Sequence, residues 1–261
     1  MSIIDFHAHI YPSKIAKKAT QSISDFYNIP MFAIEGMMSS LLKSGAQIGA
    51  SHYVVHGVAT VPQQTGRVND FLVETIKGHD NVFAYGALHP QTENIEDEVN
   101  RLIGLGFKGI KLHPDFQEFA IDSKESLLML EKIEGRLPLL MHAGDCRYNY
   151  SNPRQIANLL KALPKLTVIA AHFGGYSVWE DAIKYLSELN IYVDSSSSLP
   201  FIPIEKAREL INIFTPDRVL FGTDFPMWGH KDELERFKQV VTDQNEFDKI
   251  TFKNAQALLG I

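Results

Sequence analysis

The order of apolar segments along the chain constrains its fold more than any other sequence feature. Short apolar or β-branched runs alternate with amphipathic segments along the 261 residues, as strands alternate with helices. The runs at 137–141 and 167–171 are apolar on both faces, which is typical of parallel strands covered on both sides. The pattern predicts strands at Ser2–His7, His52–His56, Val82–Ala87, Gly109–Leu112, Leu137–His142, Thr167–Ala171, Ile191–Asp194 and Arg218–Gly222.

Amphipathic segments fill the intervals between these runs and follow the last of them. Pro153 and Pro203 suit the first turns of two of the segments, where a missing N–H costs nothing. Helices are expected at Ile34–Ser44, Val68–Lys77, Ile95–Ile103, Ser123–Ile133, Pro153–Leu163, Val178–Leu189, Pro203–Phe214 and Lys231–Val241, with a last helix at Phe247–Leu259.

Eight strands alternating with eight helices predict an α/β fold, a (β/α)8 TIM barrel with an additional C-terminal helix. No linker, low-complexity segment or internal repeat divides the chain, so residues 1–261 are expected to form a single barrel domain. A doubly wound open sheet is the alternative. It lacks support because no Gly-x-Gly-x-x-Gly motif follows the first strand.

Composition narrows the class of protein. The apolar fraction of 45% and the charged fraction of 21% are those of a globular chain, and the formal net charge of -6 disfavours a nucleic-acid partner. The single cysteine, Cys146, excludes an intrachain disulfide. There is no signal-peptide pattern at the start, and no apolar run approaches the ~18 residues of a membrane span. These features predict a cytoplasmic protein without a membrane partner.

The predicted strands end in polar residues. His7 and His9 alternate at the end of the first strand, so both side chains face the same way. His142, His172 and Asp224 end or follow three later strands. In a (β/α)8 barrel the carboxyl ends of the strands converge on the active site, so residues distant in sequence are brought together there.

Imidazole and carboxylate are ligands that zinc, iron and manganese sites use. Taken singly, each residue has an ordinary structural explanation: a hydrogen-bonded core histidine, or, for Asp224, a turn or helix-cap aspartate. Five such residues at strand ends of one barrel are hard to explain as core filling. Together they predict a catalytic metal site.

These motifs resemble the amidohydrolase superfamily, specifically the amidohydrolase 2 or aminocarboxymuconate semialdehyde decarboxylase-like branch. The resemblance spans essentially the whole chain. The matching motifs are Asp-Phe-His-Ala-His at 5–9, Gly-Ile-Lys-Leu-His-Pro at 109–114, Met-His-Ala-Gly at 141–144, Ala-His-Phe-Gly-Gly at 171–175, Phe-Gly-Thr-Asp-Phe-Pro at 221–226 and the closing segment at 250–260.

The resemblance implies a role for each matching residue. His7, His9 and His142 would bind a divalent metal, most simply Zn²⁺, with Mn²⁺ or Fe²⁺ as alternatives. Asp224 would bind the metal or accept a proton from its water. His172 would be a catalytic acid, or a ligand of a second metal. We favour one metal.

Other residues are candidates for contact with substrate. Lys111 would contact an anionic substrate or, when carboxylated, bridge two metals as in other branches of the superfamily. His113 lies two residues further on and either binds substrate or orients its loop. Arg147 is a candidate clamp for a substrate carboxylate, and Trp228 a candidate pocket wall. The run of serines at 195–198 either offers hydroxyls to substrate or forms a polar loop.

The resemblance implies a hydrolase that acts on a small anionic or cyclic amide, ester or lactone. The alternative is a decarboxylase of an unsaturated or aromatic carboxylic acid. A TatD-like nuclease would require a glutamate at the end of the fourth strand, and a binding protein without turnover would not require all five site residues. The expected partner is a small-molecule substrate. A homodimer is a hypothesis from the commonness of two-fold assemblies alone.

Overall fold

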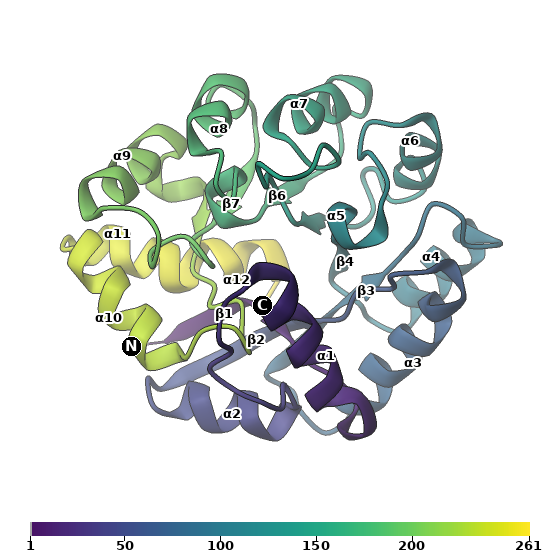
Figure 1. Cartoon of the computed structure of the whole chain (residues 1–261), viewed down its shortest axis with the longest axis horizontal. Helices are drawn as coiled ribbons and strands as arrows, with labels where there is room; N and C mark the ends of the chain where they lie inside the picture. The colour runs from purple at the N-terminus through teal and green to yellow at the C-terminus, as the bar shows by residue number, and fades with distance from the viewer. Residues whose placement is uncertain (1) are drawn as a thin grey trace. The chain divides into compact units, whose positions relative to one another are not determined.

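The computed structural model describes residues 2–261 and confirms the predicted (β/α)8 TIM barrel (Figure 1). Eight parallel strands form one sheet in the order β1 to β8. They are β1 (Ile3–His9), β2 (Ala50–His56), β3 (Val82–Ala87), β4 (Gly109–Leu112), β5 (Leu139–Met141), β6 (Val168–Ala170), β7 (Tyr192–Asp194) and β8 (Val219–Leu220).

The predicted helices are present, with ends displaced by a few residues. They are α2 (Met38–Ala46), α3 (Thr65–Ile76), α4 (Ile95–Gly104), α6 (Lys124–Leu130), α7 (Pro153–Ala162), α8 (Trp179–Leu186), α9 (Ile204–Phe214) and α10 (His230–Val240). The expected closing helix is two helices, α11 (Gln244–Asp248) and α12 (Asn254–Leu259), joined by the π-helical segment Lys249–Lys253. Asn254 fastens this region, because its side-chain amide donates to the carbonyls of Pro216 and Val219.

Two helices were not expected from the pattern, α1 (Ser13–Tyr27) and the short α5 (Pro114–Gln117). Helix α1 buries only Ala16 and Thr20, but its apolar residues do recur at helical spacing, so the sequence contained a signal for this helix that was not assigned. The end of the helix carries a second signal. Asn28 adopts a left-handed φ of 53° and its N–H bonds the carbonyl of Ser24, as asparagine commonly does after a helix.

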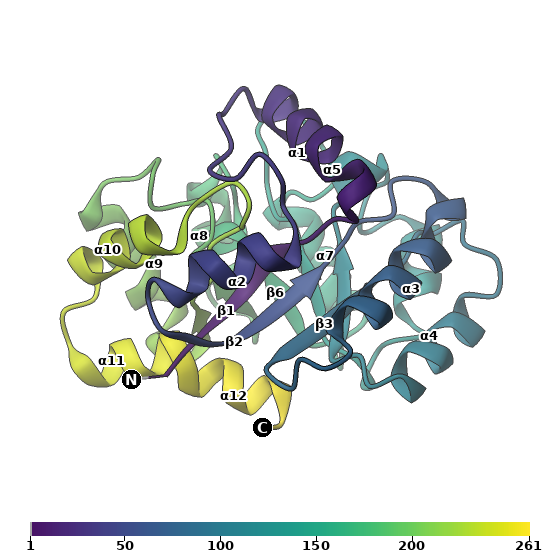
Figure 2. The same cartoon turned by 90° about the horizontal axis from the view of Figure 1, so that it is seen from below.

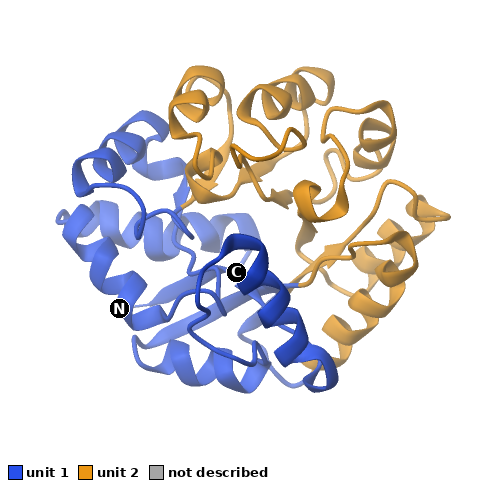
Figure 3. Cartoon of the chain, in the orientation of Figure 1, with its two compact units in different colours: residues 1–56, 78–83, 195–261 blue, residues 57–77, 84–194 orange. Residues whose placement is uncertain are grey.

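The chain falls into two compact units, which Figure 3 colours separately. The first contains the residues up to His56, residues 78–83 and residues 195–261. Within it β1 pairs with β2, and the chain after β8 returns to β1: the N–H of Phe6 bonds the carbonyl of Phe221, and Ala8 bridges Phe225. Figure 2 shows β1 and β2 side by side, with α12 near the start of β1, which it contacts. The first and last strands are therefore neighbours.

The second unit contains residues 57–77 and 84–194, including β4 to β7. Each of these strands pairs in parallel with the next. The runs predicted to be apolar on both faces are buried where they form strands: Leu139, Leu140 and Met141 of β5 have no exposed surface, and β6 is equally covered. Continuous burial explains why these strands show no alternation in sequence.

No helix within residues 2–261 has both the length and the apolar character that crossing a bilayer requires. The prediction of a single domain over residues 1–261 stays a prediction.

One buried carboxylate in the first unit has a consequence for stability. Glu233 lies on α10 with no exposed surface. Its Oε1 accepts from Arg236, and its Oε2 has no hydrogen-bond partner among the described residues. Burial raises the pKa of this carboxyl from 4.5 to about 7. Arg236 opposes the shift, and the charges of Asp224 and Asp232 add to it. Between these two values the folded chain binds more protons than the unfolded chain, so this group's stabilising contribution is lost as pH rises through that window.

We expect Glu233→Gln to remove most of this pH dependence. The pKa difference corresponds to roughly 3 kcal/mol. The free energy of unfolding of Glu233→Gln minus that of the wild-type protein should therefore increase by about 2 kcal/mol from pH 5 to pH 8, allowing for the ion pair with Arg236 that the variant loses. Denaturant unfolding at both pH values measures this change. Glu235→Gln, at an exposed position of the same helix, is the control. The same pH dependence in both variants would contradict the assignment.

Candidate metal centre and acid–base residues

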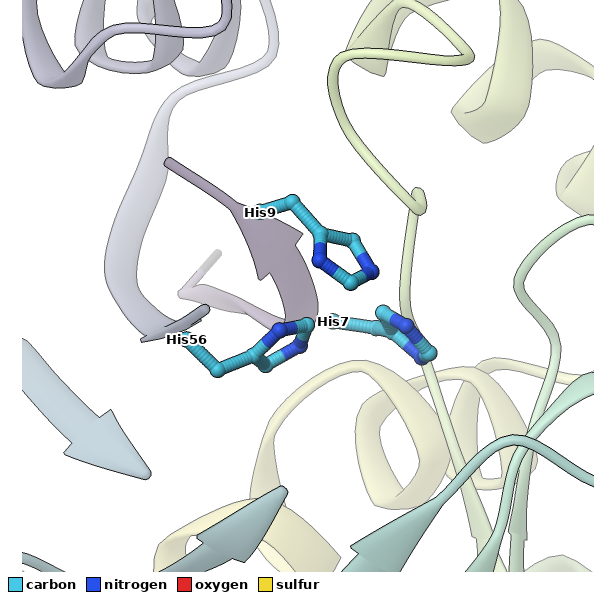
Figure 4. A group of neighbouring side chains, drawn as sticks. All are labelled: His7, His9 and His56. Atoms are coloured by element: carbon cyan, nitrogen blue, oxygen red, sulfur yellow. The ribbon is translucent and has the colours of Figure 1, made fainter. Parts of the chain in front are cut away.

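Three buried imidazoles meet at the carboxyl ends of β1 and β2. His7 and His9 project from the same side of β1, and His56 is the last residue of β2, paired with His9 in the register. The ring centroid of His56 lies 4.9 Å from that of His7 and 4.3 Å from that of His9. One nitrogen from each ring falls within 4.8 Å of the other two. Figure 4 shows the three rings turned toward one another. These residues form a candidate metal centre.

Asp224 adds a carboxylate to this group. Its Oδ1 lies 3.3 Å from Nε2 of His7 and 3.3 Å from Nε2 of His9. Tetrahedral zinc with bonds of about 2.0–2.1 Å holds its ligand atoms about 3.3–3.4 Å apart. The distances from the Asp224 carboxylate to the two imidazoles therefore match the spacing of ligand atoms in such a site. The donor set of histidine and aspartate also suits zinc or manganese, so the residues fit a divalent metal.

Asp5 joins the motif at 5–9 to the motif at 221–226 by hydrogen bonds. This carboxylate has no exposed surface and accepts from the backbone N–H groups of His7 and Thr223, at 3.1 and 3.0 Å, and from the hydroxyl of Thr223 at 2.7 Å. His230 pairs with it at 3.0 Å. Asp5 thus ties the strand that carries His7 and His9 to the segment that carries Asp224.

His142 and His172 lie in the second unit, after β5 and β6. Nδ1 of His142 lies 3.0 Å from Nε2 of His172, and its Nε2 lies 3.3 Å from Oδ2 of Asp115. The ring of His113 stacks on that of His142, with centroids 4.1 Å apart and an 8° interplanar angle. All four side chains are buried. The prediction that His142 binds the metal stays a prediction. Its immediate neighbours in its own unit are a carboxylate and two imidazoles.

The backbone of His172 is held in an unusual conformation. His172 and Phe173 have φ of 61° and 51°, in the left-handed region that non-glycine residues rarely adopt. The carboxylate of Asp194 accepts from the N–H of His172 at 3.1 Å, and the indole N–H of Trp179 donates to the carbonyl of His172 at 3.0 Å. Strained backbone that is fixed from both sides is typical of functional positions. The catalytic role expected of His172 stays a prediction.

Asp115 was not among the sequence candidates. Burial raises the pKa of its carboxyl to about 7. The hydrogen bond from Ser151 opposes the shift, the charge of Asp145 adds to it, and Arg147 opposes it. A carboxyl with a pKa near neutrality beside imidazoles is a feature of acid–base sites. In the sequence, Asp115 lies just after the motif at 109–114 and outside every predicted helix and strand, so no pattern identified it.

The proposed substrate residues lie in the second unit, Trp228 excepted. Lys111 is buried within β4. His113 caps α5: its Nδ1 accepts from the N–H of Phe116, and its own N–H donates to Gln117. That is the loop-orienting role considered above. Arg147 pairs with Asp145 through two of its nitrogens, at 2.6 and 2.9 Å, so a substrate carboxylate would have to compete with this partner.

Trp228 and Cys146 lie outside the buried groups described above. In the first unit, Trp228 donates its indole N–H to Ser197, and its ring contacts Phe201 and the guanidinium of Arg236. In the second unit, the exposed Cys146 precedes Arg147, and its N–H bonds the hydroxyl of Ser177.

The sequence matches the amidohydrolase family over residues 4–261. No curated protein shows significant similarity to the chain.

Solved structures share the fold. A probable 2-pyrone-4,6-dicarboxylic acid hydrolase from Acinetobacter baumannii, with citric acid bound, is 20% identical, with 100% of each chain covered and a TM-score of 0.73. A 2,6-dihydroxybenzoate decarboxylase from Rhizobium is 17% identical, with 100% of this chain and 99% of that chain covered and a TM-score of 0.76. A dihydroxybenzoic acid decarboxylase from a Polaromonas species, with bound manganese, is 16% identical, with 99% and 97% covered and a TM-score of 0.75.

Proposed function

Because the chain belongs to the amidohydrolase family, we propose that it is a metal-dependent hydrolase of a small anionic or cyclic amide, ester or lactone. The observation that carries this proposal is the group formed by His7, His9, His56 and Asp224, in which Oδ1 of Asp224 lies 3.3 Å from a nitrogen of His7 and of His9, the spacing of metal ligands. Zinc is the metal proposed. Manganese is the alternative, and one structure of similar fold has manganese bound.

The metal would act as a Lewis acid that lowers the pKa of water and polarises a substrate oxygen. The chain's own residues would then move the protons. Asp224 is proposed to accept a proton from the attacking water, since its carboxylate is buried beside the imidazoles of His7 and His9. His172 is proposed to donate a proton or hydrogen bond to the reacting oxygen, which its fixed backbone supports.

A decarboxylase is the second candidate function. Similar structures include both a pyrone dicarboxylate hydrolase and dihydroxybenzoate decarboxylases, and the fold does not separate the two reactions. The substrates for which these proteins are named are all carboxylic acids. Lys111, a buried lysine of β4, is proposed to contact the anionic group of the substrate in either case. Lys111, His113, Arg147 and Trp228 remain proposed substrate residues, and the homodimer remains a hypothesis that sedimentation velocity tests.

We expect freshly purified protein to contain about one equivalent of zinc or manganese per chain, measured by inductively coupled plasma mass spectrometry. Metal-loaded, chelator-treated and reloaded protein should then be compared on two substrate panels. Lactone hydrolysis is followed by proton release, amide hydrolysis by the amine that it liberates, and turnover of hydroxybenzoates by carbon dioxide release. Metal-dependent turnover of the first panel supports the hydrolase, and of the second the decarboxylase. Two equivalents would favour a carboxylated Lys111, and no uptake of metal would contradict the proposal.

A further inference from the structure

We infer that Ser196 and Ser197, in the serine run after β7, orient two of the proposed metal ligands, and that Trp228 acts through Ser197. The inference rests on the metal centre proposed above. The hydroxyl of Ser196 lies 3.1 Å from Nδ1 of His7, and the hydroxyl of Ser197 lies 2.6 Å from Oδ2 of Asp224. The run therefore supports the ligands rather than forming a plain polar loop.

Ser196 acts on the ring of His7. A histidine that binds a metal through one nitrogen usually donates its other N–H to a fixed acceptor, which sets the tautomer and the ring orientation. Here Nδ1 faces the Ser196 oxygen while Nε2 faces Oδ1 of Asp224. With the proton on Nδ1, Nε2 offers its lone pair on the side of His9 and Asp224. Both His7 and Ser196 are buried, so bulk water does not compete for this bond.

The direction of the hydrogen bonds at Ser197 follows from chemistry. An indole N–H can only donate, so Trp228 must donate to the Ser197 oxygen, at 2.9 Å. The single hydroxyl proton of Ser197 is then left for an acceptor. Its two neighbours are Oδ2 of Asp224 at 2.6 Å and the thioether sulfur of Met227 at 3.4 Å. The carboxylate is the stronger acceptor and the nearer one. Trp228 and Ser197 thus hold Oδ2, which leaves Oδ1 directed at the imidazoles.

The backbone at both ends of this contact is unusual. Ser197 has a φ of 47° and Asp224 a φ of 58°, both in the left-handed region. Such conformations are unfavourable for residues other than glycine and persist when the surroundings fix them. The hydrogen bond between these two side chains joins the two strained positions. Alanine has the same Cβ as serine, so Ser197→Ala leaves the backbone preference largely unchanged and removes the hydroxyl.

The same run supplies its own control. Ser198 is buried like its neighbours, but its hydroxyl donates only to the backbone carbonyl of Ser196, at 3.1 Å. Ser198→Ala therefore removes a buried hydroxyl from the same loop without touching a ligand side chain. Trp228→Phe is a graded variant. It keeps an aromatic ring beside Phe201 and Arg236 and removes the N–H.

The experiment measures zinc affinity by competition with a chromophoric chelator, and the visible absorption of the cobalt(II)-loaded protein. We expect Ser197→Ala to weaken zinc binding about 10–100-fold, as loss of a partner that orients a ligand does. The cobalt bands should also shift, because a carboxylate freed at Oδ2 changes its binding geometry. Ser196→Ala should weaken zinc binding similarly, Trp228→Phe less, and Ser198→Ala by under about twofold.

Melting of the metal-free variants separates orientation of the ligands from general stability. The inference is supported if Ser196→Ala and Ser197→Ala lose more zinc affinity than Ser198→Ala. The three variants must melt at comparable temperatures, and the cobalt bands of the first two must change. If the wild-type protein binds metal and Ser197→Ala binds it with the same affinity and unchanged cobalt bands, the inference is overturned. The proposed metal centre then still stands. A wild-type protein that takes up neither zinc nor cobalt overturns the metal centre and the inference with it.

Discussion

His7→Ala is expected to lower zinc affinity by about 10²–10³-fold and to remove catalytic activity with it. Zinc binding by four protein ligands is worth about 10–16 kcal/mol, so one ligand accounts for roughly 3–4 kcal/mol. His7 is 1% exposed, and its ring touches the other members of the group: His9, His56 and Asp224. Metal equivalents after dialysis and chelator competition both measure the loss.

The same assay decides which other histidines are ligands. His52→Ala is the matched control, because His52 lies on β2 with His56 but its ring stacks on Phe83 and takes no part in the group. We expect His56→Ala to behave like His7→Ala. Affinity as high as that of His52→Ala would remove His56 from the ligand set. His142→Ala tests the ligand role that the family resemblance implies, and a loss equal to that of His7→Ala would support it.

His172→Asn is expected to lower the turnover number by about 10²–10⁴-fold while the protein keeps its metal. Asparagine is the sharper replacement than alanine, because it tolerates the left-handed conformation that His172 adopts at φ 61°. It removes the acid–base group and preserves the turn that Asp194 and Trp179 hold. Steady-state kinetics on the substrate found in the panel, with metal equivalents on the same sample, measure both effects.

Trp179→Phe serves as the control for this position. It removes the hydrogen bond to the carbonyl of His172 and leaves the imidazole in place. We expect a smaller loss of turnover, about tenfold or less, since only the hold on the backbone is weakened. Metal loss in His172→Asn as large as that in His7→Ala would show that His172 is a ligand. The binuclear alternative would then replace the single-metal proposal.

The strands were predictable because a strand that is buried on both faces has apolar residues at successive positions, and this gives a continuous apolar run in the sequence. The sheet order then followed from the alternation with helices. Helix α1 was missed although its apolar residues recur at helical spacing, and the structure buries only Ala16 and Thr20 of it. The residues of the metal centre were found where strands end. His56 was missed even though it ends a predicted strand, because no recognised motif contains it.

Contacts between side chains were the least predictable part of the site. Arg147 was expected to be available to a substrate carboxylate, yet Asp145, two residues earlier, turns back to it. That turn depends on a φ of 112° at Asp145, which composition does not reveal. The serine run showed only that hydroxyls were present. Their roles depend on which neighbour each one faces, and Ser197 and Ser198 differ in this although they are adjacent.

Cys146 gives the protein a ready attachment point for a spectroscopic label. It is the one cysteine of the chain and its side chain is exposed, so a nitroxide or a fluorinated tag would react at one position without prior removal of other thiols. The tag would stand beside Arg147, on the loop that follows β5. With manganese bound at the His7 and His9 site, paramagnetic relaxation of the tag would report the distance from this loop to the metal. Adding candidate substrates would then reveal, before any turnover is known, which of them change that distance.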